Sequence, residues 1–198
     1  KMAQIATGLE AELPVSIEIT VKGEVSIYDS SILATSALKG ALIAIGTEDA
    51  TYVNSPNLAQ EKGMSATVSS EAECEDYRSM ICLRAAFSNG ARVEVDATLM
   101  GIRKVEKIIR INKFDIELPP SDHLLFLIYE DRPGVVGAVG NILGAAKINI
   151  ANMQVARDKA GGEALMALTV DSAIPIEFTE KIAKEVGARV SRSVSLLV

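Results

Sequence analysis

The residues best suited to bind a small charged molecule follow a short apolar run, Leu124 to Ile128. They are Tyr129-Glu130-Asp131-Arg132-Pro133-Gly134, and a helical pattern comes next. Pro133 is tolerated in a first helical turn, so the loop is expected to offer free backbone N–H groups to an anion. Asp131 beside them suits a cation. A free α-amino acid carries both charges on adjacent atoms. We therefore hypothesise that this loop, closed by Asn149, senses an amino acid and is not catalytic.

Each of these features also has a simpler structural interpretation. Asp131 could cap the helix, and Asn149 suits the turn after Ala146-Lys147 through its own backbone bonding. Three glycines recur at helical spacing, which favours close helix packing over ligand approach. They are Gly137, Gly140 and Gly144.

The sequence offers no catalytic constellation. His123 is the only histidine, and the adjacent pairs Glu48-Asp49 and Glu130-Asp131 lack a companion base. Neither a Gly-x-Ser-x-Gly turn nor a phosphate-binding glycine loop occurs. Cys74 and Cys82 are too far apart for a CxxC site, which favours a reduced, cytoplasmic chain without a metal.

Composition narrows the class of partner. The net charge of -6 argues against nucleic acid. The 48% apolar content supports packed cores, and no run approaches the roughly 18 apolar residues of a membrane helix.

Two prolines divide the chain of 198 residues. Leu118-Pro119-Pro120-Ser121-Asp122 should stop both a helix and a central strand, so we predict one domain over residues 1–118 and another over 119–198. Helical spacing near the start predicts a fragment of a longer helix there. The residues concerned are Met2, Ile5, Ala6 and Leu9.

The first part alternates like a half-buried strand from Val15 to Val21, then favours a helix up to Gly46 and a short one after Ser55-Pro56. Asn-Gly in Ser88-Asn89-Gly90 between β-rich runs predicts a hairpin. More strand-like residues follow up to Ile116, so this part is predicted to be α+β.

The second part gives a simpler order. Strands are predicted at 124–129, 148–156, 164–170 and 190–197, with helices from about Pro133 to Ala146 and from Pro175 to Gly187. A turn at 158–162 joins the two middle strands. The order βαββαβ is that of a ferredoxin-like sandwich with both helices on one sheet face.

Six stretches carry a resemblance to a known family. The stretches are Pro14-Val15-Ser16-Ile17-Glu18, Tyr52-Val53-Asn54-Ser55-Pro56, Tyr77-Arg78-Ser79, Lys107-Ile108-Ile109-Arg110-Ile111-Asn112, Asp131-Arg132-Pro133-Gly134 and Ile148-Asn149-Ile150. With them, the second part resembles an ACT domain. The whole chain is similar to the C-terminal regulatory half of the longer form of D-3-phosphoglycerate dehydrogenase, where an allosteric-substrate-binding (intervening) domain precedes the ACT domain.

The resemblance implies an L-serine site shared by two chains. Tyr129 and Asp131 of one chain, with the loop Arg132-Pro133-Gly134, would face Asn149 of another. Serine would then feed back on its own biosynthesis. ACT domains of this kind pair side by side, so self-association through both domains is expected. The catalytic domains with their NAD, and any plastid transit segment, would lie upstream of this cofactor-free chain.

The resemblance also implies a site for a substrate or another phosphate-bearing anion in the first part. The densest basic cluster of the chain offers Lys107 as the main candidate, then Arg110, with Arg78 as a further one. The simpler interpretation is a solvated charged strand, and for Arg78 an ion pair with Glu75 or Asp76. Two other functions stay open: part of an iron–sulfur L-serine dehydratase, or a module that only dimerises subunits.

Overall fold

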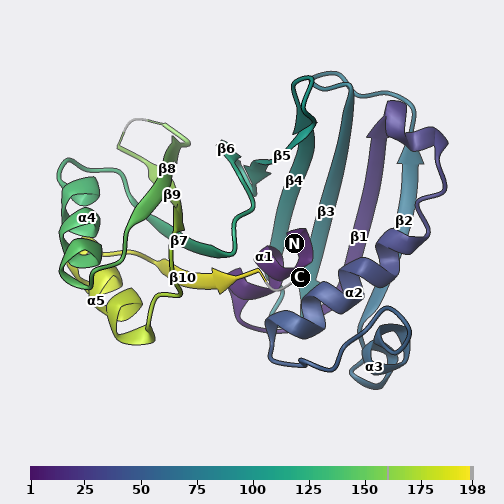
Figure 1. Ribbon diagram of the computed structural model, residues 1–198, viewed down its shortest axis with the longest axis horizontal. Coiled ribbons are helices and arrows are strands. Elements are labelled where there is room, and N and C mark those ends of the chain that lie inside the picture. The colour runs from purple at the N-terminus through teal and green to yellow at the C-terminus, as the bar shows by residue number, and fades with distance from the viewer. Residues whose placement is uncertain (160, 197–198) are drawn as a thin grey trace.

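A computed structural model describes residues 1–159 and 161–196. Two β-sheets lie side by side in it, and helix α1 (Met2–Glu10) lies between them (Figure 1). Among the described residues, no helix is both long and apolar enough to cross a lipid bilayer.

The first sheet has six strands in the spatial order β2-β1-β3-β4-β5-β6. Their bounds are β1 Pro14–Gly23, β2 Ser65–Glu71, β3 Ser79–Phe87, β4 Arg92–Met100, β5 Val105–Ile111 and β6 Phe114–Leu118. Strands β1 and β2 are parallel, and the other neighbours are antiparallel. Three helical segments connect β1 to β2: η1 Glu24–Ile27, α2 Ile32–Ala44 and α3 Ser55–Glu61.

Local sequence explains most of this sheet. Ile17, Ile19 and Val21 are buried beneath α1 and α2, while the residues between them face outward. The predicted hairpin joins β3 to β4, and its Gly90 has a φ of 84°, a conformation that glycine adopts at little cost.

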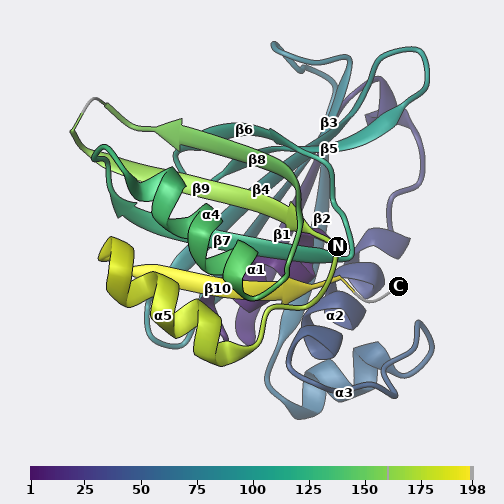
Figure 2. The ribbon, with the colours of Figure 1, turned by 60° about the vertical axis from the view of Figure 1, so that its left-hand side comes forward.

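The second sheet is fully antiparallel in the order β10-β7-β9-β8, with both helices on one face (Figure 2). Its elements are β7 His123–Glu130, α4 Val135–Ala145, β8 Ile150–Arg157, β9 Glu163–Val170, α5 Ile176–Val186 and β10 Val190–Ser195. The ferredoxin-like βαββαβ order and the α+β class are therefore confirmed. Leu197 and Ala160, which the predictions placed in the last strand and in the turn before β9, lie outside the described residues.

Two hydrophobic cores hold the chain together. One fills the space between the second sheet and helices α4 and α5. The other is shared, because it joins Phe126 and Leu165 on the opposite face of that sheet to α1, to Phe114 of β6 and to the first sheet. Since one core spans both sheets, the predicted division at residue 118 stays a prediction.

Helix α4 begins two residues later than predicted. The helix starts at Val135, and Gly134 takes the N-cap position with a φ of 92°. Pro133 lies before the helix, in the turn that leads into it. No side chain of the described residues caps α4, and Gly134 holds the N-cap position, so the simpler interpretation of Asp131 as a helix cap is wrong.

Candidate functional site

Asp131 lies directly beyond the end of β7, beside the hairpin that joins β8 to β9. Its backbone N–H donates to the Gly162 carbonyl at 2.8 Å. Its carboxylate is only 16% exposed, and its Oδ2 pairs with the Arg157 Nε at 3.4 Å. The Asp131 carboxylate is partly buried, but the guanidinium that pairs with it is at the surface. Another cation can therefore compete with Arg157 for this carboxylate.

Tyr129 lies beside this pair on the helix-covered face of the sheet. Tyr129 of β7 and Arg157 of β8 are both register partners of Ala164 in β9, so the three lie in one row across the sheet. Burial raises the pKa of the Tyr129 phenol, and the Asp131 charge raises it further, while Arg157 opposes the shift. The phenol therefore stays protonated at neutral pH and can donate a hydrogen bond.

Asn149 lies at the other end of the sheet. It directly precedes Ile150, which pairs with Val170, whereas Glu130 beside Asp131 pairs with Glu163. Seven residues of β9 separate these points, which at about 3.3 Å per residue is roughly 23 Å. Asn149 is exposed and its Nδ2 donates to Asp171 Oδ2 at 3.0 Å. One chain alone does not bring Asn149 to Asp131.

The remaining loop residues line the approach to helix α4. Arg132, Pro133 and Gly134 are all exposed, and Arg132 donates to the Glu185 carbonyl at 3.4 Å. Without a side-chain cap, the first N–H groups of α4 are free for an anion.

A cavity of about 560 Å³ lies near Tyr129, toward the first sheet. Lys113 reaches into it and bonds to Asp158 and Glu163, each at 2.9 Å, which lowers the pKa of both carboxyls. Tyr129 lines this cavity, but Asp131, Arg157 and Asn149 do not, so the cavity does not bring the predicted amino-acid-binding residues together.

A larger cavity of about 700 Å³ opens beside the first sheet, and Lys107 and Arg78 both line it, with Lys104. Arg78 pairs with Glu24 at 3.3 Å, so the expected partners Glu75 and Asp76 were the wrong ones. Within the described parts of the chain, the Lys104 and Lys107 ammonium groups have no hydrogen-bond or ion-pair partner.

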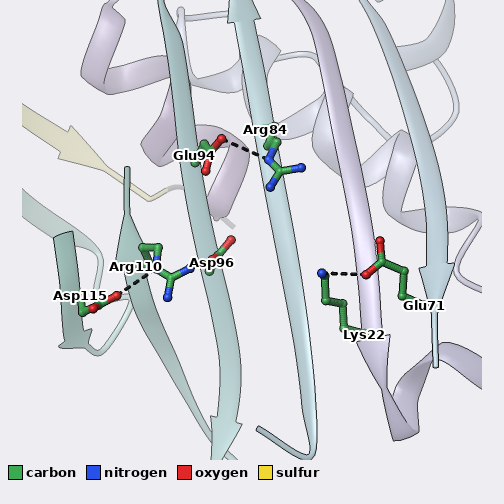
Figure 3. A network of polar contacts seen from close by, with 7 residues as sticks. All are labelled: Lys22, Glu71, Arg84, Glu94, Asp96, Arg110 and Asp115. Carbon is green, nitrogen blue, oxygen red and sulfur yellow. Dashed lines mark hydrogen bonds and ion pairs between the residues drawn. The ribbon is translucent and has the colours of Figure 1, made fainter. Parts of the chain in front are cut away.

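Arg110 does not share that cavity. Its guanidinium bonds to Asp115 at 2.9 Å and lies 3.5 Å from Asp96, within the polar network of the uncovered face of the sheet (Figure 3). Two carboxylates from neighbouring strands therefore hold Arg110 in place. The predicted grouping of Arg110 with Lys107 and Arg78 at one site is not seen.

Comparisons with known proteins give the family. Residues 1–112 match the D-3-phosphoglycerate dehydrogenase intervening domain, more than half of the chain. The chain belongs to this family. Residues 123–187 match the ACT domain, so the intervening domain is followed by an ACT domain.

Curated relatives extend the match over the whole chain. D-3-phosphoglycerate dehydrogenase of Mycobacterium leprae is 34% identical over 196 residues, which is 99% of this chain and 37% of the relative. The enzyme of Mycobacterium tuberculosis is 35% identical over 188 residues (95% and 36%), and that of Synechocystis is 32% identical over 181 (91% and 32%). The chain thus spans about a third of the length of the relatives it matches.

The intervening domain also contains a thiol that sequence reasoning left aside. Burial, and then the nearby Asp96 charge, raise the pKa of Cys82 to about 12. Because the thiolate is the reactive form, we expect iodoacetamide at pH 8 to label Cys82 far more slowly in the folded chain than in urea. Mass spectrometry on Cys74→Ser isolates Cys82, and equal labelling rates in the two conditions would contradict the burial argument.

Arg157 was not among the site residues predicted from the sequence. Arg157 is the last residue of β8 and is exposed. The alternation of polar and apolar residues along this strand could have drawn attention to an arginine at its end. Its pairing with Asp131 depends on the β8–β9 hairpin placing the two strand ends together.

Proposed function

We propose that this chain is the regulatory part of a D-3-phosphoglycerate dehydrogenase and binds L-serine where two ACT domains meet. The observation that carries the proposal is the position of Asn149 and Asp131 at opposite ends of the second sheet. A site that needs both residues requires a second copy of the chain.

The open edge of β8 supplies a way for two copies to join. Among the described strands, β8 is hydrogen-bonded only to β9, and β6 packs against it without joining its sheet, so the backbone groups of its other edge are unpaired. In an antiparallel β8–β8 pair, the start of each strand lies beside the end of the other. Asn149 of one chain would then lie next to Arg157 and Asp131 of its partner, and a two-fold axis would create two such sites.

The neighbouring face of α4 fits the same arrangement. Apart from the adjoining residues and backbone of α4 itself, no described atom lies within 4 Å of where a side chain of Gly137, Gly140 or Gly144 would begin, so the helix packing expected of them is not seen within the described part of one chain. Val136 and Val155 nearby are exposed. We infer that this face packs against α4 of the partner, where glycines allow two helix backbones to approach closely.

Chemistry supports a zwitterionic amino acid as the ligand. Asp131 and the Asn149 carbonyl accept hydrogen bonds from the ammonium group, while the α4 N-terminus, the Asn149 amide and the Tyr129 hydroxyl donate to the carboxylate. The choice of L-serine rests on the family resemblance. A ligand that contacts two chains favours the paired arrangement, which is the differential affinity that allostery requires.

The rest of the enzyme is proposed from the relatives. The relatives are named D-3-phosphoglycerate dehydrogenases and are about three times as long as this chain. On this support and on the family resemblance, we propose that the whole protein is cytoplasmic and has an upstream catalytic part that oxidises 3-phosphoglycerate with NAD and on which serine acts. The intervening-domain cavity is proposed to take a phosphate-bearing anion through Lys107 and Lys104, whose ammonium groups have no partner among the described residues. The family matches favour this enzyme over a serine dehydratase.

Disrupting the β8 edge tests the proposal. Val155 is 37% exposed in the second half of β8, so Val155→Asp would bring a carboxylate of each chain into contact with the apolar interface of its partner. Such a contact costs several kcal/mol, and we expect dimer dissociation on the order of 100-fold easier by sedimentation equilibrium, with loss of L-serine binding in parallel.

The matched control is Ile176→Asp on helix α5. Ile176 is 75% exposed and lies away from β8, so this variant should dimerise and bind like the wild type. Monomers that keep full serine affinity would contradict the shared site. Dimers that never bind serine would instead support a module that only joins subunits.

A further inference from the structure

We propose that Arg157 is a ligand-binding residue, which takes the carboxylate of the amino acid when the ammonium group takes Asp131. The inference rests on the proposed function and deepens it. This role of Arg157 restricts the ligands to amino acids with a free α-carboxylate, because the Arg157 guanidinium pairs directly with that group.

The contact between Arg157 and Asp131 is loose enough to open. At 3.4 Å it is longer than the 2.7–2.9 Å of a strong charge-assisted bond. The Arg157 side chain is 59% exposed, and among the described residues it makes no other polar contact. Most of its five N–H donors are therefore free, and moving it breaks one weak ion pair.

Inserting a zwitterion between these two residues leaves every charge paired. The ligand ammonium replaces the guanidinium at Asp131, and the ligand carboxylate takes the guanidinium that Asp131 releases. Arginine suits this role because its planar fork can hold both oxygens of a carboxylate. In the row across the sheet, the residue between Tyr129 and Arg157 is Ala164, whose side chain is only a methyl group. No long side chain therefore separates these two residues.

The position of Arg157 also suits a site between two chains. As the last residue of the edge strand β8, it lies where an antiparallel pair would place the start of the partner strand. The guanidinium can then reach the ligand from the same chain as Asp131, while the partner closes the site. Arg157 would thus determine which ligands bind, whereas the contact with the partner chain would couple binding to the pairing of the two chains.

A second possible role of Arg157 predicts the opposite effect of its removal on ligand affinity. If Arg157 only occupied Asp131 in the empty state, its removal would free the carboxylate and tighten binding. If Arg157 holds the ligand carboxylate, its removal weakens binding only for ligands that have this group.

The experiment measures the affinity of the full chain for L-serine and for L-serinamide by isothermal titration. Serinamide keeps the ammonium group but replaces the carboxylate by a neutral amide. We expect the wild type to bind serine at least about tenfold more tightly than serinamide, as one lost charged contact implies. Arg157→Met should weaken serine binding at least about tenfold and leave serinamide binding unchanged or tighter.

Two further variants complete the design. Arg157→Lys should restore part of the preference for serine, and Arg192→Met, an exposed arginine on β10, should keep all of it. Tighter or unchanged serine binding by folded Arg157→Met would overturn the inference and leave the proposed function intact. If the wild type binds neither compound, the proposed function fails, and the role of Arg157 fails with it.

Discussion

Replacing Asp131 with alanine is expected to weaken L-serine binding on the order of 100-fold. The carboxylate is the one acidic group in the cluster with Tyr129 and Arg157, and it is only 16% exposed. Hydrogen bonds to charged groups contribute about 1.5–3 kcal/mol, and an ammonium left without its partner in a shielded site costs more. Isothermal titration of the dimer measures the change, with circular dichroism to verify the fold.

Asp158→Ala is the matched control for this variant. Asp158 lies in the neighbouring hairpin with a 25% exposed side chain, and it pairs with Lys113 outside the site. We expect it to bind L-serine with wild-type affinity. Equal losses in both variants would mean that the hairpin, and not the Asp131 carboxylate, determines binding.

Phe126→Ala should destabilise the whole chain by about 3–5 kcal/mol, a large share of the stability of a typical domain. Phe126 is fully buried in the core that the ACT sheet shares with α1, β6 and the first sheet. Removing its ring leaves a cavity at the junction of the two sheets. Urea denaturation should therefore show a single transition that moves to lower urea as a unit.

Phe126→Leu provides the comparison, because it keeps most of the volume and should cost less than about 1.5 kcal/mol. Two separate transitions, of which only one moves with Phe126→Ala, would show that the intervening and ACT domains unfold independently. The shared core would then not couple them.

Most of the fold could be predicted because local patterns specify it. Alternation predicted β1, Asn-Gly predicted the β3–β4 hairpin, and the proline and glycine positions predicted the α5 boundaries. The start of α4 could not be placed from Pro133 alone, because Gly134 adopts a positive φ that delays the helix to Val135. The pairing of both sheets through one core depends on tertiary contacts that no local pattern contains.

Only those parts of the candidate site that lie close together in the sequence could be predicted as a group. Tyr129 and Asp131 are two positions apart at a strand end, so the sequence alone placed them together. Arg157 joins them through the β8–β9 hairpin, and Arg110 leaves the basic cluster because Asp96 and Asp115 on adjacent strands bind it. In the proposed site Asn149 comes from a second chain, so patterns within one sequence cannot place it beside Asp131.

The most direct test of the central claim is a mixed dimer of Asp131→Ala and Asn149→Ala chains. If each site takes Asp131 from one chain and Asn149 from the other, either homodimer lacks both sites, whereas the mixed dimer keeps one intact site. We expect titration of the purified mixed dimer to find one L-serine per dimer with wild-type affinity. A mixed dimer that binds no serine, although the wild-type dimer binds two, would contradict it.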